Sequence, residues 1–189
     1  MGAPVFIRIF KEESSLELWL QERSSGKFKL LSQYPICYFS GDLGPKQRTG
    51  DGQSPEGFYS VPPGSLNPYS DYHLSFNLGY PNAFDRAKGR TGSALMVHGG
   101  CVSIGCYAMT DDGIEEIYTL ASAALRDGQS AFQVHIFPFR MTSANLARHR
   151  HSEWLDFWSN LKEGYDLFER DQLPPRVTVR GGRYSFTRG

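Results

Sequence analysis

The residues with the clearest capacity for chemistry lie together in residues 97–109, which read VHGGCVSIGCYAM. This stretch contains His98 and two of the three cysteines of the chain, Cys101 and Cys106. A thiolate is a strong nucleophile, and a nearby imidazole or an amide-rich turn lowers the pKa of a thiol. We therefore expect a lowered pKa for Cys106. The residues alone leave two interpretations open: a thiol nucleophile activated by His98, or small buried cysteines without a chemical role.

The turn before Cys106 has a composition that suits a substrate-binding backbone. Gly105 carries no Cβ, so the chain can turn tightly there and approach a substrate carbonyl. The amides of Gly105 and Cys106 are candidates for an oxyanion hole, which stabilises the charge that develops on an attacked carbonyl oxygen.

Other chemistries fit the same stretch less well. Ser103 is followed by Gly105 but preceded by Cys101, where a serine-hydrolase elbow needs glycine. His98, Cys101 and Cys106 could contact zinc, but no second cysteine pair or suitably spaced histidine pair completes a closed ligand set. We therefore expect no metal site and no cofactor.

The elements that must position this stretch are mostly strands. Alternating and β-rich runs predict a meander of short strands over residues 5–10, 16–20, 27–31 and 34–39. The glycine-rich residues 41–57 predict a long loop, and loops of that length are often functional. Residues 94–97 predict a short buried strand that leads directly into His98, whereas residues 80–92 are expected to be irregular.

Helices are expected only in the second half of the chain. Asp112 and Glu115 have the spacing of a capping box, and the apolar residues between 114 and 125 fall on one helical face. A second helix is expected after Ser152, followed by a terminal hairpin over residues 177–186. Many strands with a few late helices predict one β-dominated α+β domain over residues 1–189.

Composition excludes several classes of protein. The chain has 189 residues and a formal net charge of zero, with 20 Lys+Arg against 20 Asp+Glu. Such neutrality argues against a nucleic-acid binder and a polybasic membrane-surface protein. No apolar run approaches the roughly 18 residues of a membrane-spanning helix. The first residues lack a signal segment, which predicts a cytoplasmic protein or a trimmed leader with residues 1–4 at its junction.

The number of cysteines is odd, so at least one thiol is unpaired within a monomer. Cys101 could pair with Cys37, buffer the reactive thiol or do neither.

Longer strings support the thiol interpretation through a resemblance. The catalytic stretch reads VHG, a spacer and SIGC, and it is preceded in order by GPK at residues 44–46 and SPEGFY at residues 54–59. These motifs resemble those of the YkuD-type L,D-transpeptidase family. Further strings, among them LGYPNAFDR and PFRMT, are most similar to its YafK-like branch over nearly the whole chain.

The resemblance implies a YkuD-type catalytic domain with a β-sandwich-like core. It implies that Cys106 is the nucleophile, that His98 is the general base, and that Ser103 and Gly105 belong to the nucleophile turn. The YafK-like branch, the diaminopimelic acid amidase, implies hydrolysis of the amide between meso-diaminopimelate and the C-terminal Lys of an outer-membrane lipoprotein. The implied partners are a peptidoglycan stem peptide and the attached lipoprotein, and the implied location is the periplasm.

Two positions depart from the usual signature of this family. Many members read Ser-His-Gly-Cys-x-Arg/Asn, but this chain has Ile104 at the His position and Ala108 at the Arg/Asn position. The departures favour hydrolysis over crosslinking. An L,D-transpeptidase that forms crosslinks or lipoprotein attachments is the alternative, and a non-catalytic peptidoglycan-binding module is the second.

Three other residues are weaker candidates for substrate binding. Arg86 could bind a substrate carboxylate or pair with Asp85. Lys46 could line the entrance of the site or belong to a solvated loop. Tyr80 could form a wall of the site or part of the aromatic core.

Overall fold

The computed structural model describes residues 2–189 and consists mainly of three β-sheets. Its strands are β1 (Val5–Phe10), β2 (Ser15–Gln21), β3 (Phe28–Pro35), β4 (Tyr38–Phe39), β5 (Gly57–Val61), β6 (Leu66–Ser70), β7 (His73–Asn77), β8 (Met96–His98), β9 (Tyr107–Ala108), β10 (Phe132–Phe137), β11 (Arg176–Arg180) and β12 (Arg183–Thr187). Its helices are α1 (Ala83–Ala87), α2 (Asp111–Arg126), α3 (Ser143–Arg148) and α4 (Leu155–Asp171), with a short 3-10 helix at Pro63–Ser65. The prediction of a β-dominated α+β fold is confirmed.

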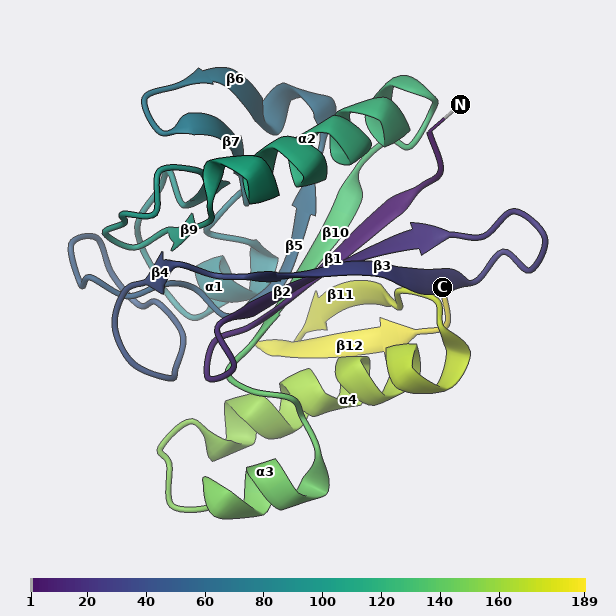
Figure 1. The fold of residues 1–189 in the computed structure, drawn as a ribbon. Helices are drawn as coiled ribbons and strands as arrows, with labels where there is room; N and C mark the ends of the chain where they lie inside the picture. The colour runs from purple at the N-terminus through teal and green to yellow at the C-terminus, as the bar shows by residue number, and fades with distance from the viewer. Residues whose placement is uncertain (1) are drawn as a thin grey trace.

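Two five-stranded sheets form the frame of the molecule (Figure 1). The strand order is β3-β2-β1-β10-β5 in the first sheet and β4-β9-β8-β7-β6 in the second. The predicted meander accounts for β1 to β3, which pair antiparallel, while β1 also pairs in parallel with the distant β10. The terminal hairpin of β11 and β12 forms the third sheet.

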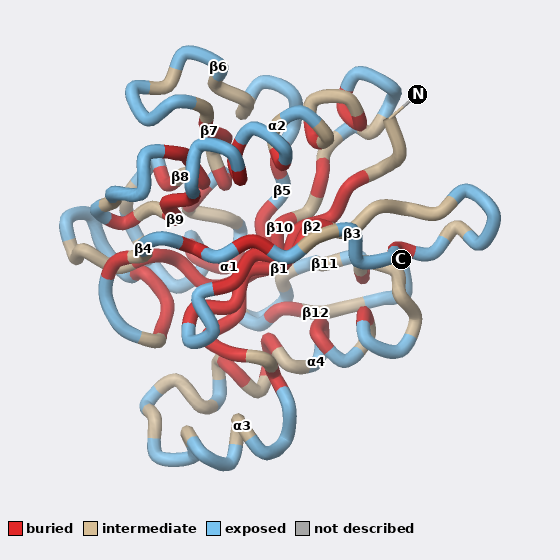
Figure 2. The backbone as a smooth tube through the Cα atoms, in the orientation of Figure 1, coloured by how far each residue is buried: buried red, intermediate tan, exposed pale blue. Residues whose placement is uncertain are grey.

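The alternation of side chains along β1 explains how the layers assemble. Ile7 and Ile9 point into the main core, which contains residues of both large sheets and of α2. Phe10 points to the opposite face, where it joins a second core that contains Trp158 of α4 and Tyr184 of the hairpin. All six residues of β1 are buried because both faces of the first sheet are covered (Figure 2).

Several helix predictions need correction. Helix α2 begins one residue before the expected Asp112 because Thr110 is its cap and accepts a hydrogen bond from the Gly113 amide. Residues 80–92 are not wholly irregular, since α1 forms there with Asn82 and Asp85 as a capping box. Helix α3 was not expected. Both missed helices have only five or six residues, too few for a clear helical period.

The long loop predicted over residues 41–57 is confirmed, because the chain forms no helix or strand between β4 and β5. This loop leaves the second sheet at β4 and enters the first at β5, and it passes next to the turn that carries Cys106. None of the described helices is long and apolar enough to cross a bilayer.

Candidate active site

Strand pairing places Cys106 and His98 on one face of the second sheet. β8 and β9 are parallel, with Val97 opposite Tyr107 and His98 opposite Ala108. Val97 and Tyr107 are fully buried in the main core. Because neighbouring side chains alternate between faces, His98 and Cys106 both point away from that core. The predicted short strand before His98 is therefore confirmed, and it presents the imidazole on the face of the thiol.

The sulfur of Cys106 is half-buried and held by the segment before β8. The amide of Met96 donates a hydrogen bond to Sγ at 3.3 Å, and Sγ lies 3.7 Å from the carbonyl oxygen of Ala94. Burial raises the pKa of the Cys106 thiol, against the smaller lowering effects of the Met96 amide, the Ser103 hydroxyl and Lys46. The expectation of a lowered pKa was wrong in direction, since desolvation of the thiolate outweighs its stabilising neighbours. A thiol with this raised pKa would need a base to react as a nucleophile.

His98 has the tautomer that such a base requires. Its Nδ1 lies 2.6 Å from the carbonyl oxygen of Gly99. A carbonyl oxygen can only accept, so Nδ1 carries the proton of the neutral ring and Nε2 keeps its lone pair. The ring is buried beneath Tyr72, with ring centroids 4.8 Å apart. Within residues 2–189, the sulfur bonds to Met96 and Ala94 and not to His98.

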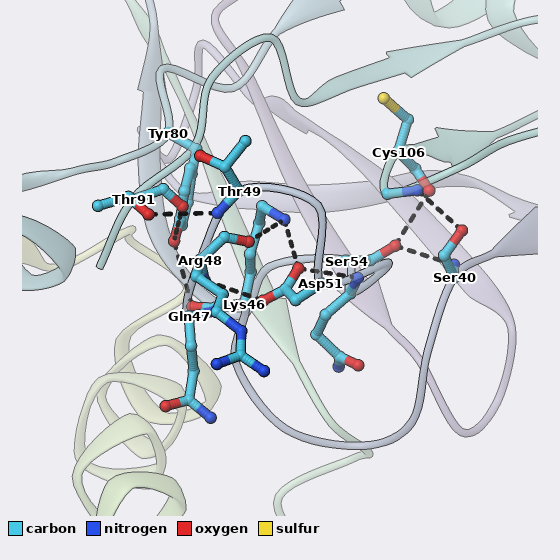
Figure 3. Close-up of polar contacts among 12 residues, drawn as sticks. Ser40, Lys46, Gln47, Arg48, Thr49, Asp51, Ser54, Tyr80, Thr91 and Cys106 are labelled. Atoms are coloured by element: carbon cyan, nitrogen blue, oxygen red, sulfur yellow. Dashed lines mark hydrogen bonds and ion pairs between the residues drawn. The ribbon is translucent and has the colours of Figure 1, made fainter.

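Three serines fix the backbone of the nucleophile turn. Ser103 Oγ accepts the amide of Cys106 at 2.9 Å, and Ser40 Oγ accepts the amide of Gly105 at 2.8 Å. Ser54 Oγ donates to the carbonyl oxygen of Cys106 at 3.1 Å and accepts the amide of Ser40 at 3.0 Å. Figure 3 shows Ser40 and Ser54 on one side of Cys106 and the sulfur pointing away from them.

These contacts bear on the expected oxyanion hole. The amides of both Gly105 and Cys106 are already bonded to serine hydroxyls, so neither is free in this conformation. An acyl oxygen would have to displace a hydroxyl or bind beside it. Ser103 belongs to the turn as expected, whereas Ser40 had no signal in the sequence, because 65 positions separate it from the amide that it accepts.

Lys46 lies in the loop that borders the sulfur. Its ammonium is buried and bonds to Asp51 at 2.5 Å and to the carbonyl oxygen of Arg48 at 3.0 Å (Figure 3). Burial raises the pKa of Asp51, but Lys46 and the amides of Arg48, Gln47 and Gln53 outweigh it and lower that pKa to about 2. The loop is thus organised around one charged pair.

A small cavity of about 230 Å³ lies between this loop and the nucleophile turn. Its lining includes Lys46, Ala94, Leu95, Ile104 and Gly105. The side chain of Ile104 in this lining is 91% exposed. Lys46 therefore shares a cavity with the turn before Cys106, and its charge is balanced by Asp51.

Tyr80 and Arg86 lie on the other side of Ala94. Both line a cavity of about 540 Å³ that also includes Ala94 and Met96, the two residues that contact the sulfur. Tyr80 is also a core residue, and its hydroxyl donates to the carbonyl oxygen of Lys46 at 3.2 Å. Of the seven site residues predicted from the sequence, Lys46 and Gly105 line the smaller cavity and Tyr80 and Arg86 line the larger one, whereas Cys106, His98 and Ser103 line neither.

Arg86 is not paired with its neighbour in sequence. The carboxylate of Asp85 pairs with Arg90 at 2.8 Å and accepts the hydroxyl of Tyr59 at 3.0 Å. Arg86 is exposed and donates to the carbonyl oxygen of Pro81. In the described part of the chain no carboxylate forms an ion pair with Arg86, so its charge is available to a ligand.

Cys37 and Cys101 form a disulfide, with their Cα atoms 5.1 Å apart. This resolves the alternatives that the sequence left for Cys101 and makes Cys106 the free cysteine among the described residues. Cys37 lies where the chain crosses from β3 to β4, and Cys101 lies in the turn between β8 and β9. The bond ties the nucleophile turn to the connection between the two large sheets.

A buried polar cluster fixes the base of the long loop. Lys11 is fully buried and forms an ion pair with Glu56 at 3.2 Å. Its ammonium also donates to the carbonyl oxygens of Gly44 at 2.8 Å and Ser54 at 2.7 Å. Glu56 accepts the amide of Gly44 and the indole of Trp158. The sequence did not predict this cluster, which holds the loop that carries Lys46 and Ser54.

Comparison with known proteins agrees with this geometry. The L,D-transpeptidase catalytic domain, YkuD, matches residues 10–136. YafK of Escherichia coli (strain K12), a proposed L,D-transpeptidase, is 55% identical over 184 residues, which cover 97% of this chain and 74% of YafK. The helical cell shape determining protein Pgp2 from Campylobacter jejuni has a similar fold, with a TM-score of 0.56 and 19% identity over 95% of this chain and 73% of that chain. Bdellovibrio bacteriovorus Bd1075 aligns with a TM-score of 0.51 and 16% identity over 95% of this chain and 78% of its own.

Proposed function

This chain belongs to the YkuD family of L,D-transpeptidase catalytic domains, and we propose from that premise that it is a cysteine-dependent peptidoglycan amidase. Family membership makes it an L,D-transpeptidase-like enzyme that acts on peptidoglycan. The proposed reaction is hydrolysis of the amide between meso-diaminopimelate of a stem peptide and the C-terminal Lys of an attached outer-membrane lipoprotein. The observation that carries the proposal is that Cys106, whose thiol pKa is raised by burial, shares a sheet face with His98, whose Nδ1 lies 2.6 Å from the Gly99 carbonyl oxygen.

The first half of the reaction transfers the acyl group to sulfur. The thiol turns toward Nε2 of His98, which takes its proton as the sulfur attacks the amide carbonyl carbon. The Gly99 carbonyl stabilises the resulting imidazolium because it accepts the Nδ1 proton at 2.6 Å. His98 then protonates the lysine nitrogen as the carbon–nitrogen bond breaks. The products of this half are a free lysine amine and a thioester on Cys106.

The second half decides between hydrolysis and transpeptidation. In hydrolysis His98 takes a proton from water as the water oxygen attacks the thioester, and the thiol is regenerated with a free carboxylate. In transpeptidation an amine takes the place of water. Ala108 is fully buried and Ile104 is exposed and apolar, so neither offers the charge or amide that many relatives carry beside the thiol. This loss of an acceptor-binding group supports hydrolysis.

Substrate carboxylates have two candidate partners beside the sulfur. Arg86 offers a cation without an acidic partner among the described residues, whereas Lys46 is already paired with Asp51. We assign Arg86 the larger role in recognition and Lys46 the role of shaping the cleft, with Tyr80 holding the Lys46 backbone. The proposed location is the periplasm, which is supported by the disulfide, since such bonds persist in oxidising compartments.

A product assay tests the proposal. Sacculi that carry covalently attached lipoprotein are incubated with the wild-type protein and with Cys106→Ala, and the soluble products are identified by mass spectrometry. We expect released lipoprotein and stems that end in diaminopimelate with the wild type only. New stem dimers or newly attached amines would instead support the transpeptidase. Equal binding of sacculi without products from either protein would support the non-catalytic binding module.

A further inference from the structure

The last strand of the first sheet, β5, has an open edge beside the active site. β5 pairs with β10 on one side, and no strand of residues 2–189 pairs with its other side. Phe58 directs both main-chain groups to the open side, where its amide meets the Tyr184 hydroxyl at 3.5 Å and its carbonyl accepts Asn82 Nδ2 at 2.8 Å. Alternation directs the amide and carbonyl of the exposed Ser60 the same way. The Phe58 groups are therefore already bonded to side chains, whereas those of Ser60 face the open side, and unpaired edge groups are templates for an added strand.

A groove of about 610 Å³ runs along this edge. One wall is Phe58 to Ser60 of β5, and the opposite wall is Arg176 to Val179 of β11. Gly79 borders the groove, and a Cβ at this position would sit 3.7 Å from the Ser60 carbonyl oxygen. Its lack of a side chain keeps the Ser60 carbonyl approachable.

The groove adjoins the cavity beside the sulfur of Cys106. Gly79 and Arg86 line both the edge groove and the cavity that contains Ala94 and Met96 beside the sulfur. Arg86 therefore stands where the two cavities join. No aspartate or glutamate lines either cavity, and the charged side chains that do are Arg86 and Arg176. A ligand here is expected to offer main-chain hydrogen bonds together with negative charge.

From these observations we infer that the groove binds the polypeptide that is bonded to diaminopimelate, in an extended conformation. This inference rests on the proposed function and assigns a binding surface to the polypeptide part of its substrate. The C-terminal lysine of the polypeptide places its side chain at the sulfur and its terminal carboxylate at Arg86. The preceding residues run along Ser60 and add a strand to the first sheet. Recognition by main-chain pairing suits a polypeptide leaving group and offers nothing to a bare amine.

Binding to the inactive Cys106→Ala protein tests the inference separately from turnover. One labelled probe is a tripeptide stem whose diaminopimelate carries a single lysine. The other carries a decapeptide that ends in that lysine, with its carboxylate free. We expect the decapeptide probe to bind on the order of tenfold more tightly in fluorescence anisotropy, the size of one additional net hydrogen bond.

Two variants remove the groove in different ways. Ser60→Pro deletes the outward amide, which an edge strand tolerates, and Ala83→Trp fills the groove from the exposed surface of α1. Each is expected to bring the two probes to equal affinity without changing the binding of the single-lysine probe. Ala87→Trp, on the same helix but outside the groove lining, is the matched control.

The outcomes separate the two proposals. Equal affinity of the probes for the unmodified groove, or no binding of either, overturns the inference. If Ser60→Pro and Ala83→Trp weaken the binding of both probes equally, the groove binds the stem peptide. That result would also overturn the inference. Selective binding of the decapeptide probe without hydrolysis by the wild type leaves the groove standing and rejects the amidase.

Discussion

At the residue scale, the proposed reaction needs a proton to pass from the Cys106 thiol to the His98 imidazole. Burial raises the pKa of the thiol, and the Gly99 carbonyl fixes the imidazole proton on Nδ1. A thiolate–imidazolium pair at rest would react with any electrophile that reached it. A thiol that loses its proton only during attack is less exposed to such reactions.

The first prediction concerns the pH dependence of thiol labelling. Because the folded pKa is raised, the thiolate fraction of Cys106 is small at neutral pH and grows as the pH rises toward and beyond the ordinary thiol value of about 8.5. The rate of alkylation by iodoacetamide is therefore expected to keep rising above that pH. The measurement is the labelling rate between pH 6 and 10, compared with a short cysteine peptide (~8.5). A plateau below neutral pH would contradict the raised pKa.

The second prediction separates the base from the nucleophile. His98→Ala removes the group that accepts the thiol proton and is expected to lower kcat by about 10²–10⁴-fold. The raised thiol pKa is attributed mainly to burial, so alkylation of Cys106 at pH 9 (roughly the ordinary thiol range) should change little. Turnover of the single-lysine probe and its labelling rate are measured on the same preparation. Unchanged turnover would remove His98 from the mechanism.

The sequence pointed to Cys106 and His98 as candidates but not to the groups that hold them. The two candidates lie in one short motif, and strands β8 and β9 put them on one sheet face. The hydrogen bond from Gly105 to Ser40 joins residues that are distant in sequence, and the acceptor of Nδ1 is a main-chain carbonyl that any residue could provide. Neither of these two contacts produces a recognisable pattern of residue types in the sequence.

At the element scale, the loop between β4 and β5 is held in place by buried polar contacts. Lys11 in the turn after β1 bonds to carbonyl oxygens of this loop, and Glu56 at the loop end binds both Lys11 and Trp158 of α4. One buried charge pair thus joins the first sheet, the loop and α4.

The third prediction tests that junction. Lys11→Met leaves Glu56 buried without its cation and is expected to lower the free energy of unfolding by about 3–5 kcal/mol. The measurement is urea denaturation followed by circular dichroism. Lys162→Met, which breaks the more exposed pair with Asp166 on α4, should change stability by less than about 0.5 kcal/mol. Similar losses in both variants would contradict the role given to the buried pair.

Helices and strands were predicted correctly where a hydrophobic pattern extends over many residues, and less well where it covers only a few. The alternation in β1 to β3 and the helical period of α2 gave the right elements. The cap of α2 is Thr110 because the chain turns there after β9, and nothing in the spacing favoured it over Asp112. The short β8 was predicted from its buried apolar residues, whereas β9, with two residues, was not predicted.

At the scale of the whole molecule, the site lies where the chain passes between the two large sheets. β1 pairs with β10, and β8 pairs with β9. The alternation of apolar and polar residues predicts strands but does not specify which strands pair. The pattern of strands and late helices predicted the fold class, and the resemblance predicted the YkuD-type domain. The strand order and the face that holds Cys106 and His98 came from the structure.

The last prediction concerns the disulfide that spans this crossing. Cys37 and Cys101 are 64 positions apart, so their bond restricts a large part of the unfolded chain and also anchors the nucleophile turn. The double variant Cys37→Ala/Cys101→Ala is expected to lose about 2–4 kcal/mol of unfolding free energy. Its turnover should fall as well, because the turn that positions Cys106 is tied to β4 at one fewer point. Reductant should lower the melting temperature of the wild type toward that of the variant and leave the variant unchanged. Equal melting temperatures for oxidised wild type and variant would show that the serine contacts alone hold the turn.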